Sequence, residues 1–239
     1  MIIGSLPFLL YFQALRGQPL VLWQDSQVRW FFSILLAAVG FMVLYQVGEN
    51  SLPLDQAIRY TVFNVTSILT GTGYTTDDYG QWGGFAVVMF FFAMFIGGCA
   101  GSTSCGIKVF RFQVLYAAAR SQMSRLLQPH GVFVANFNRR PIPESVMDSV
   151  MSFFFLFILS FAVMAVALSF MGLDFITAVS GAGTAIANVG PGLGDVIGPS
   201  GTFAPLPDMA KWLLALGMLL GRLEVLTVLI LFTRAFWRS

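Results

Sequence analysis

Residues 69–76 read LTGTGYTT, and this stretch decides how the rest of the chain is interpreted. Soon after it the chain becomes strongly apolar, with GQWGGFAVVMFFFAMFI over residues 80–96. The glycine-rich stretch has neither the 3.6-residue period of a helix nor the alternation of a strand. Its position between two hydrophobic segments has to be explained by the character of the whole chain.

The composition is that of a membrane protein. Hydrophobic residues make up 57% of the 239 residues and charged residues only 10%, and the mean hydropathy is +0.79. A net charge of +2, without a basic run interleaved with aromatic residues, argues against a nucleic-acid partner. One histidine and two cysteines leave little for metal or redox chemistry, so Cys99 and Cys105 are interpreted as small packing residues.

Several apolar windows approach the ~20 residues that a helix needs to cross a bilayer. Residues 30–47 and 151–171 are uninterrupted, whereas residues 212–232 contain Arg222 and Glu224. Residues 85–96 supply only twelve apolar positions before GGCAGSTSCG, so that helix must break and resume after Gly106. Residues 1–20 are interpreted as the end of a preceding membrane helix.

Charged residues orient these spans. The segment from residue 108 to 144 is basic, because it contains only one acid, Glu144, and the basic residues Lys108, Arg111, Arg120, Arg125, Arg139 and Arg140. The positive-inside rule therefore predicts that this segment is cytoplasmic. Residues 48–81 and 172–211 are mainly acidic and are predicted to lie outside, through Glu49, Asp55, Asp77, Asp78, Asp174, Asp195 and Asp208.

The two outer segments share one organisation. Each begins with an acid, Asp55 or Asp174, continues through a weakly apolar stretch too short to cross, and reaches a glycine-rich turn before the next span. Irregular backbone survives at membrane depth only inside protein or beside water. We therefore predict an all-α integral membrane protein with tandem helix–pore loop–helix repeats of the potassium-channel type. The repeats occupy residues 21–120 and 145–239, joined by a cytoplasmic connector at 121–144.

Alignment of the two glycine stretches places Thr70-Gly71-Thr72-Gly73-Tyr74 over Ala187-Asn188-Val189-Gly190-Pro191. A potassium filter replaces the ion's hydration shell with carbonyl groups, which needs glycine conformations that a Cβ forbids. The acids suit the positive ends of the half-helices, whose negative ends would favour a cation at the filter. The predicted filter residues are Thr70, Gly71, Thr72, Gly73, Tyr74, Asn188, Val189 and Gly190, with potassium at Gly71, Thr72, Asn188 and Val189. Pro191 opposite Tyr74 makes this filter asymmetric and less selective, and ordinary glycine turns are the competing interpretation.

The broken helix suggests a gate. Residues 97–106 lack the GK[ST] ending of a phosphate-binding loop, which leaves close packing of small residues or a flexible loop under the filter. Arg222 lies inside an apolar window, where a charge marks either a functional site or an ion pair with another helix. In the functional interpretation Arg222 bonds to carbonyl groups of the loop. The predicted gate residues are Gly97, Gly98, Gly101, Ser102, Gly106 and Arg222.

Four stretches resemble the Trk/Ktr/HKT superfamily of potassium transporters, and within it the bacterial TrkH-type proteins: SILTGTGYTTDDYGQW, GGCAGSTSCGIKVFR, AIANVGPGLG and GRLEVLTVLILFTRAFWR. The resemblance implies four helix–pore loop–helix repeats around one pore. This chain resembles two of them, the third and fourth, so a fragment or truncated product is expected. Alternatives are a non-conducting half that needs a second chain and, less favoured, a membrane-embedded enzyme, whose only histidine, His130, would lie in the basic loop.

The resemblance also implies the biology. It implies potassium uptake across the bacterial inner membrane by a multi-pass protein that is not an enzyme, with potassium as substrate and no covalent cofactor. The implied partners are membrane lipid, a second copy in the complete protein, and a cytoplasmic nucleotide-binding ring of the TrkA or KtrA kind, for which the basic loop from Arg120 to Arg140 offers a surface.

Overall fold

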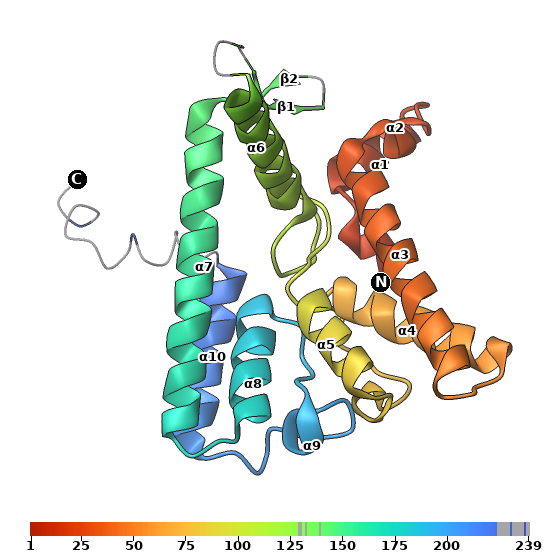
Figure 1. Ribbon diagram of the computed structural model, residues 1–239, viewed down its shortest axis with the longest axis vertical. Helices are drawn as coiled ribbons and strands as arrows, with labels where there is room; N and C mark the ends of the chain where they lie inside the picture. The colour runs from red at the N-terminus through yellow and green to blue at the C-terminus, as the bar shows by residue number, and fades with distance from the viewer. Residues whose placement is uncertain (129–130, 132, 139, 224–229, 231–236, 238–239) are drawn as a thin grey trace.

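The computed structural model describes residues 1–128, 131, 133–138, 140–223, 230 and 237 (Figure 1). The described part is built from helices, apart from one short antiparallel hairpin of β1 (Asn136–Phe137) and β2 (Arg140–Pro141). The predicted all-α class is therefore confirmed.

Two helices are long and apolar enough to cross a bilayer within the described residues: α3 (Ser26–Gly48) and α7 (Glu144–Phe170). They contain the windows expected at 30–47 and, but for its last residue, 151–171. The Asp25 carboxylate begins α3 by accepting hydrogen bonds from the amides of Gln27 and Val28, at 2.8 and 3.3 Å. Large apolar side chains stand exposed along α7, as expected beside lipid: Phe155, Ile158, Leu159, Val163 and Val166.

The two expected half-helices are α4 (Leu54–Leu69) and α8 (Phe175–Ala187). At 13 residues α8 is about 20 Å long, which is shorter than a bilayer core. It packs between α7 and α10 (Asp208–Arg222), whereas α4 packs against α3. The window expected at 212–232 begins inside α10, but residues 224–229 and 231–236, and with them Glu224, lie outside the described part.

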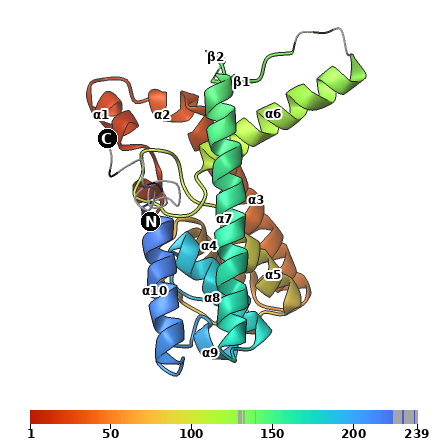
Figure 2. The same ribbon diagram turned by 90° about the vertical axis from the view of Figure 1, so that its left-hand side faces the viewer.

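The expected helix break is present between α5 (Gly84–Ala93) and α6 (Val109–Leu127). Ile96 and Ile107 form a parallel bridge that closes the intervening loop at its base. Beyond the break, α6 diverges from α7 and projects from the body of the molecule (Figure 2). It continues past residue 120, so the connector expected at 121–144 begins as helix.

The beginning of the chain forms η1 (Ile2–Ser5), α1 (Phe8–Leu15) and α2 (Val21–Gln24). With eight residues, α1 alone is too short to cross a bilayer, and the interpretation of residues 1–20 as the end of a membrane helix stays a prediction. Two short elements complete the fold: η2 (Tyr79–Gln81) and α9 (Gly194–Ile197). Figure 1 shows α9 at the opposite end of the molecule from β1 and β2.

Two hydrophobic clusters form the main core. The first joins α3, α4 and α5 through residues such as Phe31, Ile68 and Phe90, and the second joins α7, α8 and α10. The first cluster also includes Val189 and Leu193, which follow α8 in the chain. Because Val189 and Leu193 pack into the cluster of the first half, the two glycine stretches lie close together.

Candidate ion pathway and gate

The half-helices place an acid at their beginnings, as expected from the sequence. Asp174 precedes α8 and its carboxylate accepts a hydrogen bond from the Thr177 amide at 3.1 Å, while Asp55 lies in the first turn of α4. The hydrogen bonds from Thr177, first from its side chain and then from its amide, lower the pKa of the exposed Asp174 carboxyl below its ordinary value. The opposite ends of α4 and α8, which carry partial negative charge, lead into the glycine stretches.

The first glycine stretch, residues 70–76, turns back directly from the end of α4. Thr70 caps the helix, and the amides of Thr72 and Gly73 donate hydrogen bonds to the Ser67 carbonyl at 2.9 and 3.4 Å. Gly71 and Gly73 adopt φ angles of +65° and +77°, which side chains disfavour. The glycines are thus required by the local backbone.

The second glycine stretch, residues 187–193, follows α8 in a related way. Asn188 ends the helix in the left-handed conformation, and its side-chain amide donates to the Met218 carbonyl of α10 at 2.9 Å. The amide of Val189 donates to the Thr184 carbonyl at 3.1 Å, and that of Gly190 donates to the Thr184 hydroxyl at 3.0 Å. Asn188 is therefore a helix cap rather than part of an extended stretch, a detail that the sequence alignment did not anticipate.

The two glycine stretches touch at the positions that the sequence analysis aligned. A Cβ built on Gly73 would collide with the Val189 carbonyl oxygen, and one built on Gly190 would lie 3.6 Å from the Gly73 Cα. Main-chain carbonyl groups from both halves of the chain therefore lie side by side, next to the negative ends of α4 and α8. Such groups can coordinate an alkali cation, whereas the described residues contain no cluster of three or more histidine, cysteine or acidic side chains.

The small-residue loop, residues 97–106, is folded tightly on itself. The Gly97 amide donates to the Ile107 carbonyl at 2.9 Å, and the Gly98 amide donates to the Ser104 hydroxyl at 2.8 Å. The Ser102 hydroxyl donates to the Cys99 carbonyl at 2.6 Å. Cβ atoms on Gly97 and Gly98 would collide with atoms of this loop or of Ser5, which explains why the break contains glycine.

The start of the chain also holds the small-residue loop, which sequence reasoning missed. The amides of Cys99 and Thr103 donate to the carbonyls of Ser5 and Gly4 at 2.9 and 3.1 Å, and the Phe8 amide donates to the Gly101 carbonyl at 3.1 Å. These are main-chain contacts that residues of any type can make. No residue type in 1–8 therefore signalled them.

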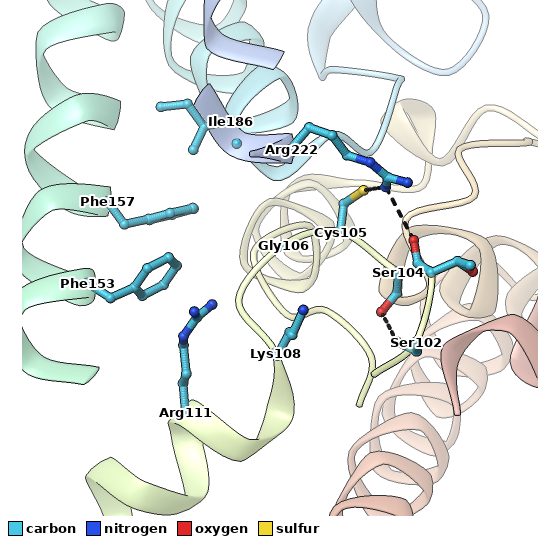
Figure 3. Close-up of a pocket in the computed structure, with 12 residues that line it drawn as sticks. Ser102, Ser104, Cys105, Gly106, Lys108, Arg111, Phe153, Phe157, Ile186 and Arg222 are labelled. Carbon is cyan, nitrogen blue, oxygen red and sulfur yellow. Dashed lines mark hydrogen bonds between the residues drawn. The ribbon is translucent and has the colours of Figure 1, made fainter. Parts of the chain in front are cut away.

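Arg222 reaches the loop from the other side. Its Nη1 atom lies 3.3 Å from the Thr103 carbonyl oxygen and 2.7 Å from Cys105 Sγ (Figure 3). The predicted contact of Arg222 with a loop carbonyl is present, and the thiol of Cys105 is an additional acceptor. Both cysteines are free thiols, but Cys105 is a partner of the arginine rather than a mere packing residue.

A cavity of about 210 Å³ lies beside this contact. Arg222 lines one side, and Lys108, Arg111 and the rings of Phe153 and Phe157 line the other (Figure 3). The Arg111 guanidinium stacks on the Phe153 ring at 3.7 Å. Cationic groups from α6 and α10 therefore line the same cavity as the small-residue loop.

Gly221 allows α10 to approach the end of α8 closely. A Cβ on Gly221 would collide with the Ile186 carbonyl oxygen at the end of α8. The absence of a side chain lets α10 touch the end of α8, and the next residue, Arg222, reaches Thr103 and Cys105 of the small-residue loop. Gly221, which precedes Arg222 in the sequence, is thus required for steric reasons.

Comparison with known proteins agrees with this geometry. The chain is 50% identical to the Trk system potassium uptake protein TrkI of Halomonas elongata over 239 residues, which is all of this chain and 48% of that protein. It is 36% identical to the Trk system potassium uptake protein TrkH of Vibrio parahaemolyticus, over all of this chain and 50% of that protein. The chain thus spans about half the length of these relatives.

The fold is also that of a solved transporter. The crystal structure of the potassium transporter TrkH from Vibrio parahaemolyticus superposes with a TM-score of 0.92 at 34% identity, covering 99% of this chain and 51% of that one. The relatives and the matching family are named for transport, which agrees with the prediction of a transport protein that is not an enzyme. Residues 6–239 match the TrkH cation transport protein family, and the chain therefore belongs to that family.

Proposed function

We propose that this chain supplies two pore-loop units of a potassium uptake pathway in a bacterial inner membrane. The observation that carries the proposal is the contact of Gly73 with Val189 at the ends of two half-helices from different halves of the chain. Carbonyl groups in such a place can replace the water around potassium, and the helix ends add negative potential. The ion would be the substrate, with no other cofactor.

The relatives named as potassium uptake proteins are about twice as long as this chain. A pathway enclosed on all sides therefore needs further pore-loop units, in the same polypeptide or in a second one. A chain that serves only as a structural half remains the second candidate, because the coverage of about half supports it equally.

The small-residue loop is the proposed gate. Its position between α5 and α6, and its bond to Arg222, would allow it to obstruct ions that pass the glycine stretches. A guanidinium beside the pathway would repel cations in the closed state. Opening would require the loop to leave Arg222 and residues 4–8 together.

The proposed topology places the α6–α7 connector in the cytoplasm and residues 77–80 and 194–207 outside. The opposite locations of α9 and the hairpin in Figure 1 support this assignment, as does the charge distribution. In the complete protein we expect several membrane passes and a second copy as partner.

A cytoplasmic nucleotide-binding ring of the TrkA kind is the proposed regulatory partner. Arg120, Arg125 and Arg140 are exposed basic residues that would bind it; Arg139 is a fourth basic residue of this segment of the sequence and lies outside the described residues. Neutralising all four should abolish co-purification of the ring with the membrane protein, whereas Lys211→Gln in α10 should not. Unchanged co-purification of the fourfold variant would contradict this docking surface.

The test of the function uses a chimera in which this chain replaces the matched half of Halomonas elongata TrkI. We expect the chimera to restore rubidium uptake and growth at low potassium in a bacterium without its own potassium uptake systems. The 239-residue chain alone, expressed in parallel, tests whether further units are needed. A chimera that inserts into the membrane without rubidium uptake would contradict the proposal.

A further inference from the structure

Asn64 of α4 is a fully buried polar residue that bonds to the chain beyond the first filter glycine. Its exposed fraction is 0%. Its carbonyl oxygen accepts a hydrogen bond from the Thr76 amide at 3.1 Å, and its Nδ2 lies 3.2 Å from the Thr76 hydroxyl and 3.0 Å from the Tyr60 carbonyl. The side chain therefore ties the outer end of the first glycine stretch to its own half-helix.

Ser180 of α8 makes the corresponding contact in the second half of the chain. It is 2% exposed. Its hydroxyl accepts a hydrogen bond from the Leu193 amide at 3.0 Å and lies 3.3 Å from the Leu193 carbonyl oxygen. Both polar groups of the Leu193 backbone are thus bound by one side chain.

The two contacts reach equivalent positions of the two glycine stretches, although Asn64 is nine residues before Gly73 and Ser180 is ten residues before Gly190. Thr76 and Leu193 are each the third residue after the central glycine, Gly73 or Gly190. The inner ends of the two stretches are also held alike, by Ser67 and Thr184, each the sixth residue before its glycine. The same arrangement therefore arises twice from different side chains, an amide in one half and a hydroxyl in the other.

We infer that Asn64 and Ser180, called here the filter braces, are positioning residues that determine the ion selectivity of the glycine stretches. This inference rests on the proposed function. One account of filter selectivity attributes the discrimination between potassium and sodium to the size of the cavity that the carbonyl groups form, and that size depends on how firmly they are held. A stretch tied to the half-helix at both ends cannot bend inward around a smaller ion without breaking a brace.

Thr61 provides a matched control. It lies on α4 one turn before Asn64 and is likewise 0% exposed, but its hydroxyl has no hydrogen-bond partner among the described residues. Thr61→Val therefore removes a buried hydroxyl of the same helix without removing a brace.

The experiment measures the ratio of rubidium to sodium uptake in the chimera, normalised to the protein inserted in the membrane. We expect Asn64→Leu and Ser180→Ala each to lower the ratio by about threefold to tenfold, the effect of losing one or two hydrogen bonds. Thr76→Val should lower it less, Thr76→Ser should keep the parent value, and Thr61→Val should leave it unchanged.

The outcomes separate the inference from its competitors. The inference would be overturned if Ser180→Ala and Asn64→Leu both kept the rubidium-to-sodium uptake ratio of the parent chimera. Thr76→Val takes the place of Asn64→Leu if the latter fails to insert. An equal loss of selectivity in Thr61→Val would also overturn it, because it would indicate a general effect of packing. A parent chimera without rubidium uptake would contradict the proposed function itself, and the inference with it.

Discussion

Gly73 is the glycine of the first stretch that lies against the backbone of the second stretch. A side chain there meets the Val189 carbonyl oxygen and also strains a φ of +77°. We therefore expect Gly73→Ser in the chimera to reduce potassium-over-sodium selectivity by about tenfold, or ~1.4 kcal/mol. Gly190→Ser should also reduce selectivity: the nearest atom to its Cβ is 3.6 Å away, so no collision arises, but its φ of +121° disfavours any side chain.

Ion competition in flux assays measures this change. Gly40→Ala in α3 is the control, because a Cβ there has no neighbour within 4 Å among the described residues. Unchanged selectivity in both filter-glycine variants would remove these stretches from the filter.

Arg222 makes a separate prediction, about the gate. If its bonds to Thr103 and Cys105 hold the small-residue loop, Arg222→Ala should raise basal rubidium flux per inserted molecule several-fold, even without the regulatory ring. Arg222→Lys should rescue only partly, because one ammonium group cannot reproduce the fork geometry of a guanidinium. Rubidium uptake is measured together with the amount of membrane-inserted protein. A fall in inserted protein without extra flux would instead indicate a structural ion pair.

Among the elements, α8 depends on its N-terminal cap. The pKa of Asp174 lies below its ordinary value, so its carboxylate stabilises the folded state above that value, and this contribution is lost as the pH falls through the folded-state pKa. Asp174→Ala should cost about 1 kcal/mol at neutral pH. Asp174→Asn keeps a capping oxygen and should therefore lose less stability than Asp174→Ala. Its stability should also decline less than that of the wild type as the pH falls.

Thermal unfolding of the purified protein in detergent, followed from pH 7 into the acid range, measures both effects. An acid-induced loss of stability that is identical in wild type and Asp174→Asn would contradict the role of this carboxylate.

For the molecule as a whole, the topology is testable by labelling. Gln122 and Ala204 are both exposed. Each is replaced by a single cysteine in a background with Cys99→Ala and Cys105→Ser. Because basic residues surround the first and acidic residues the second, an impermeant thiol reagent should label Ala204→Cys in intact cells and Gln122→Cys only after the membrane is opened. Labelling at position 122 from outside would reverse the assignment.

The sequence alone determined the elements. The long helices, the half-helices that begin near Asp55 and Asp174, and the break at residues 97–106 all follow from local composition, because apolar runs, capping acids and glycines act over a few neighbouring residues. The alignment on Gly73 and Gly190 identified them as equivalent positions of the two glycine stretches, but not that the stretches touch there.

Only the tertiary structure decided which groups bond across the chain. Gly73 lies against the Val189 carbonyl oxygen, and the Cys105 thiol accepts a hydrogen bond from Arg222. Residues 4–8 form main-chain hydrogen bonds with the small-residue loop. Several of these contacts use main-chain atoms, which every residue possesses and which leave no mark in a sequence. The filter braces were missed for a related reason: an amide in one half and a hydroxyl in the other perform the same task, so no repeated letter reveals them.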